Sequence, residues 1–186
     1  MYALSVKIRD ILRPYWRWIS HHYTILILVL TAILVSLLFT ELFILSLFIV
    51  IGALSFLPKH ISPALGFELL TLATVTAGIA FSPWAGPFVG SAGAFLSSFF
   101  INPQEPGWVL NTFLFAILGL GTVFASYTSF AVYGILATFL FDLLYVTLSC
   151  FLFSANRVYS GLYMVTHLLI NSLLFLRLKS VIFALV

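Results

Sequence analysis

The stretch FAVYGILATFLFDLLYVTLSCFL, residues 130–152, decides the fold class. Its single charged residue is Asp142. A helix needs about 20 mostly apolar residues to cross the hydrocarbon core of a bilayer, so this stretch predicts a transmembrane helix. Strands of a membrane barrel alternate apolar and polar residues over about ten positions. Neither this stretch nor the unbroken apolar run Ile25–Leu38 shows that alternation.

The composition of the whole chain supports the same fold class. Of its 186 residues, 63% are apolar and 7% are charged, whereas a soluble domain has about 45–50% apolar and 25% charged residues. The 8 Lys+Arg and 5 Asp+Glu are too few to cover a globular surface. These values exclude a soluble enzyme, a disordered chain, a disulfide scaffold and a nucleic-acid binder. We expect an all-α, polytopic integral membrane bundle with six or seven transmembrane helices.

Seven apolar segments, separated by short polar or proline-containing breaks, are expected to form this bundle. They are residues 24–40, 42–57, 65–82, 84–101, 109–126, 130–152 and 160–178. Glu41 separates the first two without a Gly or Pro, so residues 24–57 also fit one long, tilted helix. The positive-inside rule does not decide between six and seven spans, because both topologies place six cations inside and two outside. The number of spans and the side of the C-terminus therefore stay open.

The N-terminal residues carry half of the cations of the chain. Four of the 8 Lys+Arg lie within the first seventeen residues: Lys7, Arg9, Arg13 and Arg17. They fall mostly away from the apolar face of residues 3–19, which is the pattern of a helix lying on a membrane surface. We predict a cytoplasmic amphipathic helix over residues 1–22 and a single transmembrane domain over residues 23–186, placed in the cell membrane in contact with its lipids.

Small residues recur every four positions between residues 78 and 98. They are Gly78, Ser82, Gly86, Gly90, Ala94 and Ser98. Such a ladder lets two helix backbones approach closely. We favour packing between helices as its role. A docking surface for another subunit and the floor of a substrate cavity are the functional alternatives.

Two later segments carry polar stripes at helical spacing. The first has Gly134, Thr138, Asp142, Tyr145 and Ser149, and the second has Ser160, Tyr163, Met164, His167 and Asn171. A carboxylate facing lipid costs roughly 2.5–3.5 kcal/mol, so both stripes should turn inward. Asp142 then accepts a hydrogen bond from His167 or Asn171 if the two helices face each other. A structural clamp and a ligand-binding or proton-linked role both fit this pattern.

Two further polar features lie at the breaks between segments. Glu68 opens the third segment, where a carboxylate complements the helix dipole; a place at the mouth of a cavity is the alternative. The loop Asn102–Trp108, followed by Asn111, is the longest polar stretch after the N-terminus. Trp108 there anchors the chain at the membrane interface, or the loop forms a wall of a ligand pocket.

No catalytic constellation emerges from the sequence. The pair His167 and Asn171 resembles the His-x-x-x-Asn helix of rhomboid proteases, but Ser91 lies in a shifted Gly-Ser-Ala-Gly turn and no second His follows. A serine without a base is not a protease nucleophile. The four His are scattered, Cys150 is the single cysteine, and no glycine-rich phosphate loop precedes a helix. We expect no enzymatic activity, no metal and no cofactor.

Residues 63–100 resemble a known family. The stretch AGIAFSPWAGPFVG, residues 77–90, is similar to the Gly-x-x-x-Gly-Pro-x-x-Gly-x-x-x-Gly signature of the substrate-binding (S) components of energy-coupling-factor (ECF) vitamin transporters. The MreD family of membrane proteins has a similar helix pair. The resemblance implies a six-helix bundle that captures a vitamin-like solute from outside. Such a bundle docks on a membrane coupling subunit driven by two ATPases.

We therefore predict a membrane-embedded binding subunit for a small, vitamin-like solute. Its expected substrate-binding residues are Trp108, Asn111, Asp142, His167 and Asn171. Its expected helix-packing or partner-binding residues are Gly78, Gly86, Gly90 and Ala94. The alternative is a non-transporting scaffold or accessory subunit of a larger membrane complex, similar to MreD. Neither function involves nucleic acid.

Overall fold

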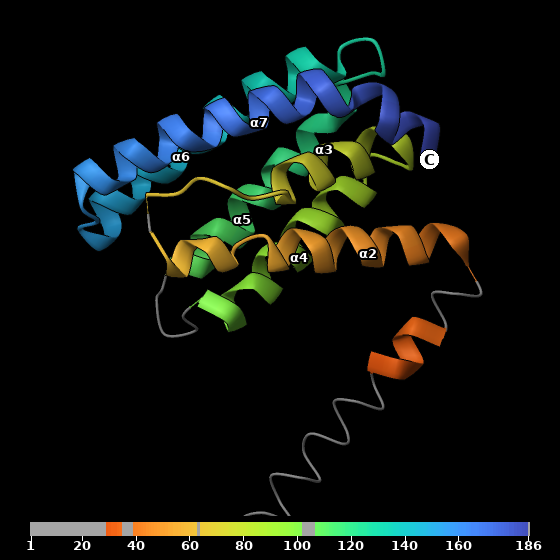
Figure 1. Ribbon diagram of the computed structural model, residues 1–186, viewed down its shortest axis with the longest axis horizontal. Coiled ribbons are helices and arrows are strands. Elements are labelled where there is room, and N and C mark those ends of the chain that lie inside the picture. Colours follow the sequence, from red (N-terminus) through yellow and green to blue (C-terminus); the bar gives the residue numbers. More distant parts are fainter. Residues whose placement is uncertain (1–28, 35–38, 63, 102–106, 186) are drawn as a thin grey trace, which may run out of the picture. The chain divides into compact units, whose positions relative to one another are not determined.

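The computed structural model describes residues 29–34, 39–62, 64–101 and 107–185, and these ranges contain helices and no strand. The all-α prediction is thereby confirmed (Figure 1). After a short helical stretch at residues 29–34, the elements are α2 (Thr40–Leu54), η1 (Leu57–His60), α3 (Leu70–Ala80), α4 (Ala85–Ile101), α5 (Gly107–Leu120), η2 (Gly121–Phe124), α6 (Phe130–Phe153) and α7 (Arg157–Leu185).

Four of the described helical segments are long and apolar enough to cross a membrane. They are Thr40–Lys59, Gly107–Phe124, Phe130–Phe153 and Arg157–Ala184. The apolar helices α3 and α4 are shorter, with 11 and 17 residues, or about 16 and 25 Å. The described residues thus indicate a membrane protein with at least four helices of spanning length, and they do not decide between six and seven spans.

The chain divides into two compact units between Phe43 and Ile44. The second unit contains every element from the body of α2 to α7. The predicted amphipathic helix and the predicted domain boundary after residue 22 lie outside the described residues, as does most of the predicted segment 24–40.

Helix α3 begins at Leu70, five residues later than predicted, because residues 64–69 lie against α7 instead. The Gly66 N–H donates to the Thr166 hydroxyl at 2.9 Å, and the same hydroxyl lies 2.9 Å from the Ala64 carbonyl oxygen. A Cβ atom at position 66 would overlap the backbone of His167, so only glycine permits this approach. Thr166 satisfies backbone groups that would otherwise be unpaired inside the protein.

The small-residue ladder is used inside the chain, where α4 packs on α3 and α5. A Cβ at Gly86 would lie 3.0 Å from the Gly119 carbonyl oxygen, and one at Gly90 would lie 2.8 Å from that of Phe115. A Cβ at Gly78 would overlap the Thr122 side chain. Ala94 is buried in the same core. The three glycines therefore lie against other segments of this chain.

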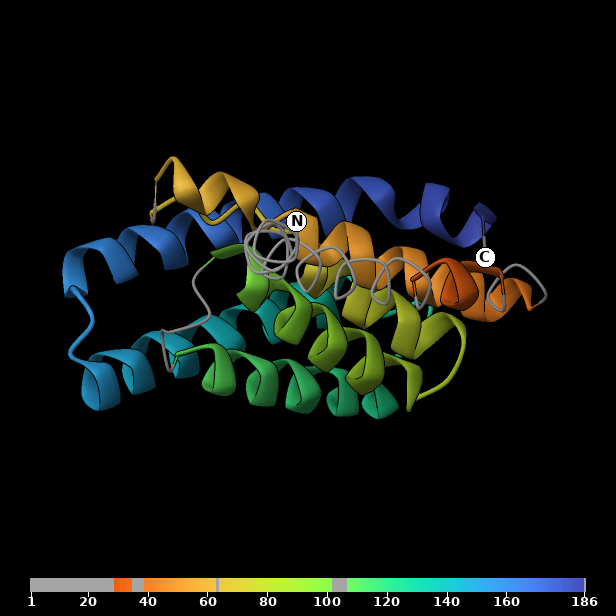
Figure 2. The same cartoon turned by 90° about the horizontal axis from the view of Figure 1, so that it is seen from below.

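Helices α6 and α7 form an antiparallel hairpin that turns sharply at the left edge of Figure 2. Ser154 adopts the left-handed conformation with φ of 55°, and its N–H donates to the Ser149 carbonyl. Asn156 then caps the start of α7, because its side-chain oxygen accepts the N–H groups of Val158 and Tyr159. The hairpin places Gly134 against Phe175 and Asp142 against His167, so the two polar stripes face each other, which was the condition for the expected contact of Asp142.

Candidate functional site

Three ionisable side chains from distant parts of the sequence meet inside the bundle. His167 Nδ1 lies 2.6 Å from Asp142 Oδ1, and His167 Nε2 lies 2.7 Å from Glu68 Oε1. None of the three side chains has solvent-exposed surface. We call Glu68, Asp142 and His167 the acid–histidine cluster. The predicted contact between Asp142 and His167 is confirmed.

Glu68 has two structural roles, of which the sequence indicated one. Its carboxylate accepts the backbone N–H groups of Leu70 at 3.0 Å and Thr71 at 3.2 Å, together with the Thr71 hydroxyl. It therefore complements the start of α3, as predicted. Its contact with His167, 99 residues away, is the role that sequence analysis missed. The extended segment 64–69 holds Glu68 in place by crossing α7 at His167.

Hydrogen bonding keeps Glu68 in its ionised form. Burial raises the pKa of Glu68, but hydrogen bonds from His167 and Thr71 and the positive charge of Lys59 outweigh burial. The pKa of this carboxyl therefore lies below its usual value of 4.5. Glu68 is thus an acceptor-only group in the cluster at neutral pH.

The geometry fixes how many protons the cluster shares. Each ring nitrogen of His167 lies within hydrogen-bond distance of a carboxylate oxygen, so each contact must hold one proton. The two protons lie on an imidazolium between two carboxylates, or on a neutral imidazole and one carboxylic acid. Both arrangements have a net charge of −1. Transfer of a proton from one arrangement to the other would leave that charge unchanged.

Lys59 lies beside the cluster and balances its charge. Its ammonium nitrogen lies 4.3 Å from the Phe56 ring centroid and 4.4 Å from that of Tyr163. It interacts electrostatically with Glu68 and Asp142. The Tyr163 ring also stacks on His167, with 5.1 Å between centroids. The four charged groups together are neutral, which reduces the penalty for burying them.

Two buried oxygen atoms beside the cluster have no hydrogen-bond partner. They are Asp142 Oδ2 and Asn171 Oδ1. The Asn171 side-chain N–H₂ donates to the His167 carbonyl at 3.2 Å, which fixes the amide so that its oxygen is the unpaired atom. Leaving a buried acceptor unpaired costs about 1–3 kcal/mol. No donor among the described protein groups reaches either atom, and the buried hydroxyls of Thr74, Thr76, Thr112 and Ser149 are likewise unpaired.

The other predicted ligand residues lie elsewhere. Trp108 packs edge-on against Phe95, with 5.7 Å between ring centroids, where α5 meets α4. Asn111 is half-buried on α5. None of the contacts that hold the acid–histidine cluster involves either residue, and loop residues 102–106 lie outside the described ranges. The structure thus brings Asp142, His167 and Asn171 together and adds Glu68 and Lys59.

Among the described residues, no group of His, Cys, Asp and Glu is placed to hold a metal ion. In the cluster, the two nitrogens of His167 point to opposite sides and each already faces a carboxylate. The arrangement suits hydrogen bonding and proton sharing. No protein-family model, characterised protein or solved structure matches this chain.

Proposed function

We propose that this chain is a membrane-embedded binding protein for a small solute that carries hydrogen-bond donors. The observation that supports this proposal is the pair of unpaired, buried acceptors, Asp142 Oδ2 and Asn171 Oδ1, beside the acid–histidine cluster. Binding sites for small molecules use a few convergent polar groups within apolar surroundings. Because both free atoms are acceptors, a solute with N–H or O–H groups complements them.

A purely structural clamp would be built differently. Buried polar networks that only hold helices together are stable when every member is paired. Here the second oxygen of Asp142 and the amide oxygen of Asn171 remain unpaired although both side chains are fully buried. Ionisable groups within membrane-spanning helices commonly belong to substrate or proton pathways. The two unpaired acceptors next to the charged cluster favour solute binding over a clamp.

The resemblance of residues 77–90 to the S components of ECF transporters supports a more specific form of this proposal, which names the kind of solute and the partners. It implies a vitamin-like solute, no catalysis, and partnership with a coupling subunit and two ATPases. The four cations in the first seventeen residues support a place in the cell membrane with a cytoplasmic N-terminus. The MreD-like alternative used the small-residue ladder as a partner surface. The glycines of this ladder, Gly78, Gly86 and Gly90, instead contact other segments of the same chain. They therefore do not form the partner surface that this alternative needs.

A thermal-stability screen of the detergent-purified chain tests the proposal. The probes are thiamin, riboflavin, pyridoxamine, pantothenate and biotin. A solute at 100 times its Kd stabilises the folded state by about 2.7 kcal/mol, which gives a clear rise in Tm. We expect at least one donor-bearing probe to raise the Tm of the natural protein and to leave that of the Asn171→Leu variant unchanged.

Asn111→Leu is the matched control, because it removes the same amide from a site outside the cluster. It should retain the Tm rise. If the Tm rise is lost in Asn111→Leu and kept in Asn171→Leu, the solute binds near Asn111 on α5 and not beside the cluster. If no probe raises the Tm, the solute-binding proposal fails. Purification from native membranes in mild detergent tests the partners: a coupling subunit with two ATPase chains supports the transporter, and another stable set contradicts it.

A further inference from the structure

The pairing of α6 and α7 places a third oxygen atom beside the two unpaired acceptors of the candidate site. Two levels of the hairpin, eight residues apart on each helix, are held by the pairs Gly134–Phe175 and Asp142–His167. Thr138 on α6 and Asn171 on α7 each lie midway between these levels, so the two residues face each other across the hairpin. Both side chains are fully buried. The Thr138 hydroxyl thus belongs to the same polar region as Asp142 Oδ2 and Asn171 Oδ1.

These three oxygen atoms are free only to accept hydrogen bonds. The Thr138 hydroxyl donates its proton to the Gly134 carbonyl at 2.7 Å. The side-chain nitrogen of Asn171 donates to the His167 carbonyl. The protons shared by the acid–histidine cluster lie in the two contacts of the imidazole, so Asp142 Oδ2 carries none. The region therefore offers a solute three acceptor atoms, and each donor atom of these side chains already has an acceptor.

Three free acceptors are complemented best by an ammonium group. A primary ammonium has three N–H donors and no acceptor, which gives one donor for each oxygen. A hydroxyl group or a water molecule donates fewer hydrogen bonds. It also brings lone pairs of its own, which are costly to leave without a donor inside a protein.

Lys59 shows that an ammonium group is accommodated beside the cluster. Its nitrogen lies 4.3 Å from the Phe56 ring centroid and 4.4 Å from that of Tyr163, and aromatic rings in this position bind organic cations. Among the described residues, no hydrogen bond or salt bridge joins this nitrogen to a partner, and the side chain is only half-buried. The rings and the negative charge of the cluster hold Lys59, and its long side chain is able to turn outward.

The charge balance of the site determines what happens to Lys59 when a cation binds. The acid–histidine cluster has a net charge of −1, because two protons are shared by one imidazole and two carboxylates. Lys59 makes the site neutral. A second positive charge would leave a net charge of +1 inside the protein, which is unfavourable. Exchange of one ammonium for the other keeps the site neutral.

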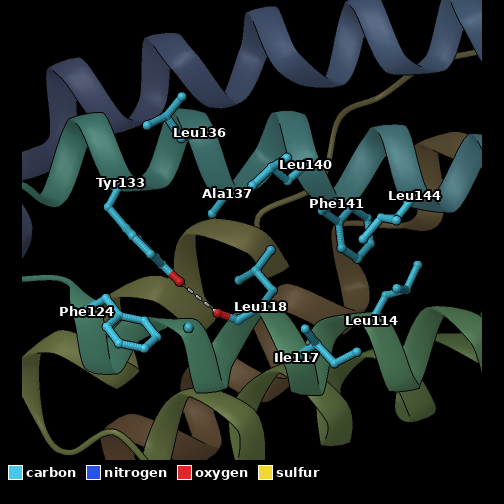
Figure 3. A pocket seen from close by; sticks show the side chains of 11 residues that line it. Leu114, Ile117, Leu118, Phe124, Tyr133, Leu136, Ala137, Leu140, Phe141 and Leu144 are labelled. Carbon is cyan, nitrogen blue, oxygen red and sulfur yellow. Dashed lines mark hydrogen bonds between the residues drawn. The ribbon is translucent and has the colours of Figure 1, made fainter.

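The apolar pocket between α5 and α6 does not provide this chemistry (Figure 3). Its volume is about 400 Å³, and Tyr133 is the only residue of its lining with a polar side-chain atom. That hydroxyl donates to the Leu118 carbonyl at 3.1 Å. Phe141 lines the same pocket, and its ring centroid lies 6.2 Å from that of His167. A cation therefore finds its acceptors on the α7 side of α6 and not in this pocket.

We propose that the solute is an organic cation whose primary ammonium group binds Thr138, Asp142 and Asn171. On binding, it displaces the ammonium group of Lys59, which turns outward. This inference rests on the proposed solute-binding function and adds two things to it: the charge of the solute and Thr138 as a third binding residue. Lys59 neutralises the cluster before the solute binds and competes with it afterwards.

Pairs of probes that differ in one group test the charge of the solute. Benzylammonium and benzyl alcohol form one pair, and pyridoxamine and pyridoxine form the other; each pair exchanges an ammonium for a hydroxyl. The full chain in detergent is titrated with each probe at neutral pH, and the Tm gives an apparent Kd. We expect the ammonium member of at least one pair to bind at least tenfold more tightly than the alcohol.

Two variants test the residues. Lys59→Met removes the competing ammonium and should lower the apparent Kd of the ammonium probe at least tenfold. Lys179→Met is the matched control, because the ammonium of Lys179 also lies over a ring, 4.5 Å from the Tyr127 centroid, and the side chain is equally half-buried. It should leave the Kd unchanged. Thr138→Val replaces the third acceptor by a methyl group and should raise the Kd at least tenfold; it decides the matter if gel filtration shows that Lys59→Met does not fold.

Three outcomes would overturn this inference. If a neutral probe raises the Tm and neither ammonium probe binds more tightly than its alcohol, the chain binds a solute that is not an ammonium, and only the proposed function stands. If no probe of any charge raises the Tm, both proposals fail. If NaCl raises the Tm and KCl does not, the three oxygen atoms bind a sodium ion instead.

Discussion

The α4–α5 contact and the α6–α7 contact hold helices together in opposite ways. Helices α4 and α5 meet through glycine, with Gly86 against Gly119 and backbone almost touching backbone. Helices α6 and α7 meet through ionisable and polar side chains, with Asp142 against His167 and Glu68 added from the segment before α3. The first contact gains its stability from close packing, and the second from hydrogen bonds between charged groups.

The difference indicates which contact has a role beyond folding. At the glycine contact the unpaired polar atom is a neutral hydroxyl, that of Thr74 beside Gly90. The α6–α7 contact retains two unpaired acceptors, Asp142 Oδ2 and Asn171 Oδ1, in a fully buried place. If α6 and α7 only had to pack against each other, glycines such as those between α4 and α5 would be sufficient. The polar contact therefore supports the proposed solute-binding role.

The largest effect should follow from removing the central imidazole. His167→Leu leaves two buried carboxylates facing an apolar side chain, which should destabilise the protein by about 3–5 kcal/mol. Thermal unfolding in detergent measures the loss. Leu169→Ala, at a lipid-facing position of α7, is the control and should change Tm little. If the Tm of the His167→Leu variant equals that of the natural protein, the cluster does not hold the α6–α7 contact.

The glycine contact should respond to a single methyl group. Gly119→Ala would place its Cβ against the backbone of Gly86 and Pro87, which cannot move aside, so we expect a loss of about 1–3 kcal/mol. Gly161→Ala is the matched control, since a Cβ there meets nothing within 4 Å. It should stabilise α7 by up to about 1 kcal/mol. Equal effects of the two variants on Tm would refute close packing at Gly119.

A smaller and opposite effect is expected at the unpaired amide. Asn171→Leu removes one weak hydrogen bond to the His167 carbonyl and also removes an unpaired acceptor. These changes offset each other, so the free energy of unfolding should stay within about 1 kcal/mol of the natural value or rise. Denaturant titration measures it. A loss of several kcal/mol would instead make Asn171 a structural member of the contact.

The smallest effect should appear on acidification. The pKa of Glu68 is lower in the folded protein than its usual 4.5, so the unfolded chain binds more protons as the pH falls. The stability that Glu68 contributes is therefore complete above pH 4.5 and is lost as the pH falls through its lower folded value. Tm measured between pH 7 and pH 3 should fall less steeply in Glu68→Gln than in the natural protein. Identical slopes would contradict the ionised state of Glu68.

Local periodicity explains which parts of this structure were predictable. The polar stripes of α6 and α7 have helical spacing and lie on adjacent helices, so the contact between Asp142 and His167 followed from the sequence. The glycine spacing of α4 predicted a close contact but not Gly119 as its partner. Glu68 was predictable only as the start of a helix. Its contact with His167 depends on segment 64–69, which has no periodicity and is held by Thr166 from another helix.

The separation of Glu68 from His167 has a consequence for the synthesis of this protein. Helix α3 has 11 residues, too few to cross a bilayer alone, and its first turn depends on a carboxylate whose partner lies 99 residues further along the chain. At about 5–20 residues per second, a ribosome needs roughly 5–20 s to reach His167 after Glu68. The contact between Glu68 and His167 therefore forms only after α7 has been translated, whereas the bonds from Glu68 to Leu70 and Thr71 are local.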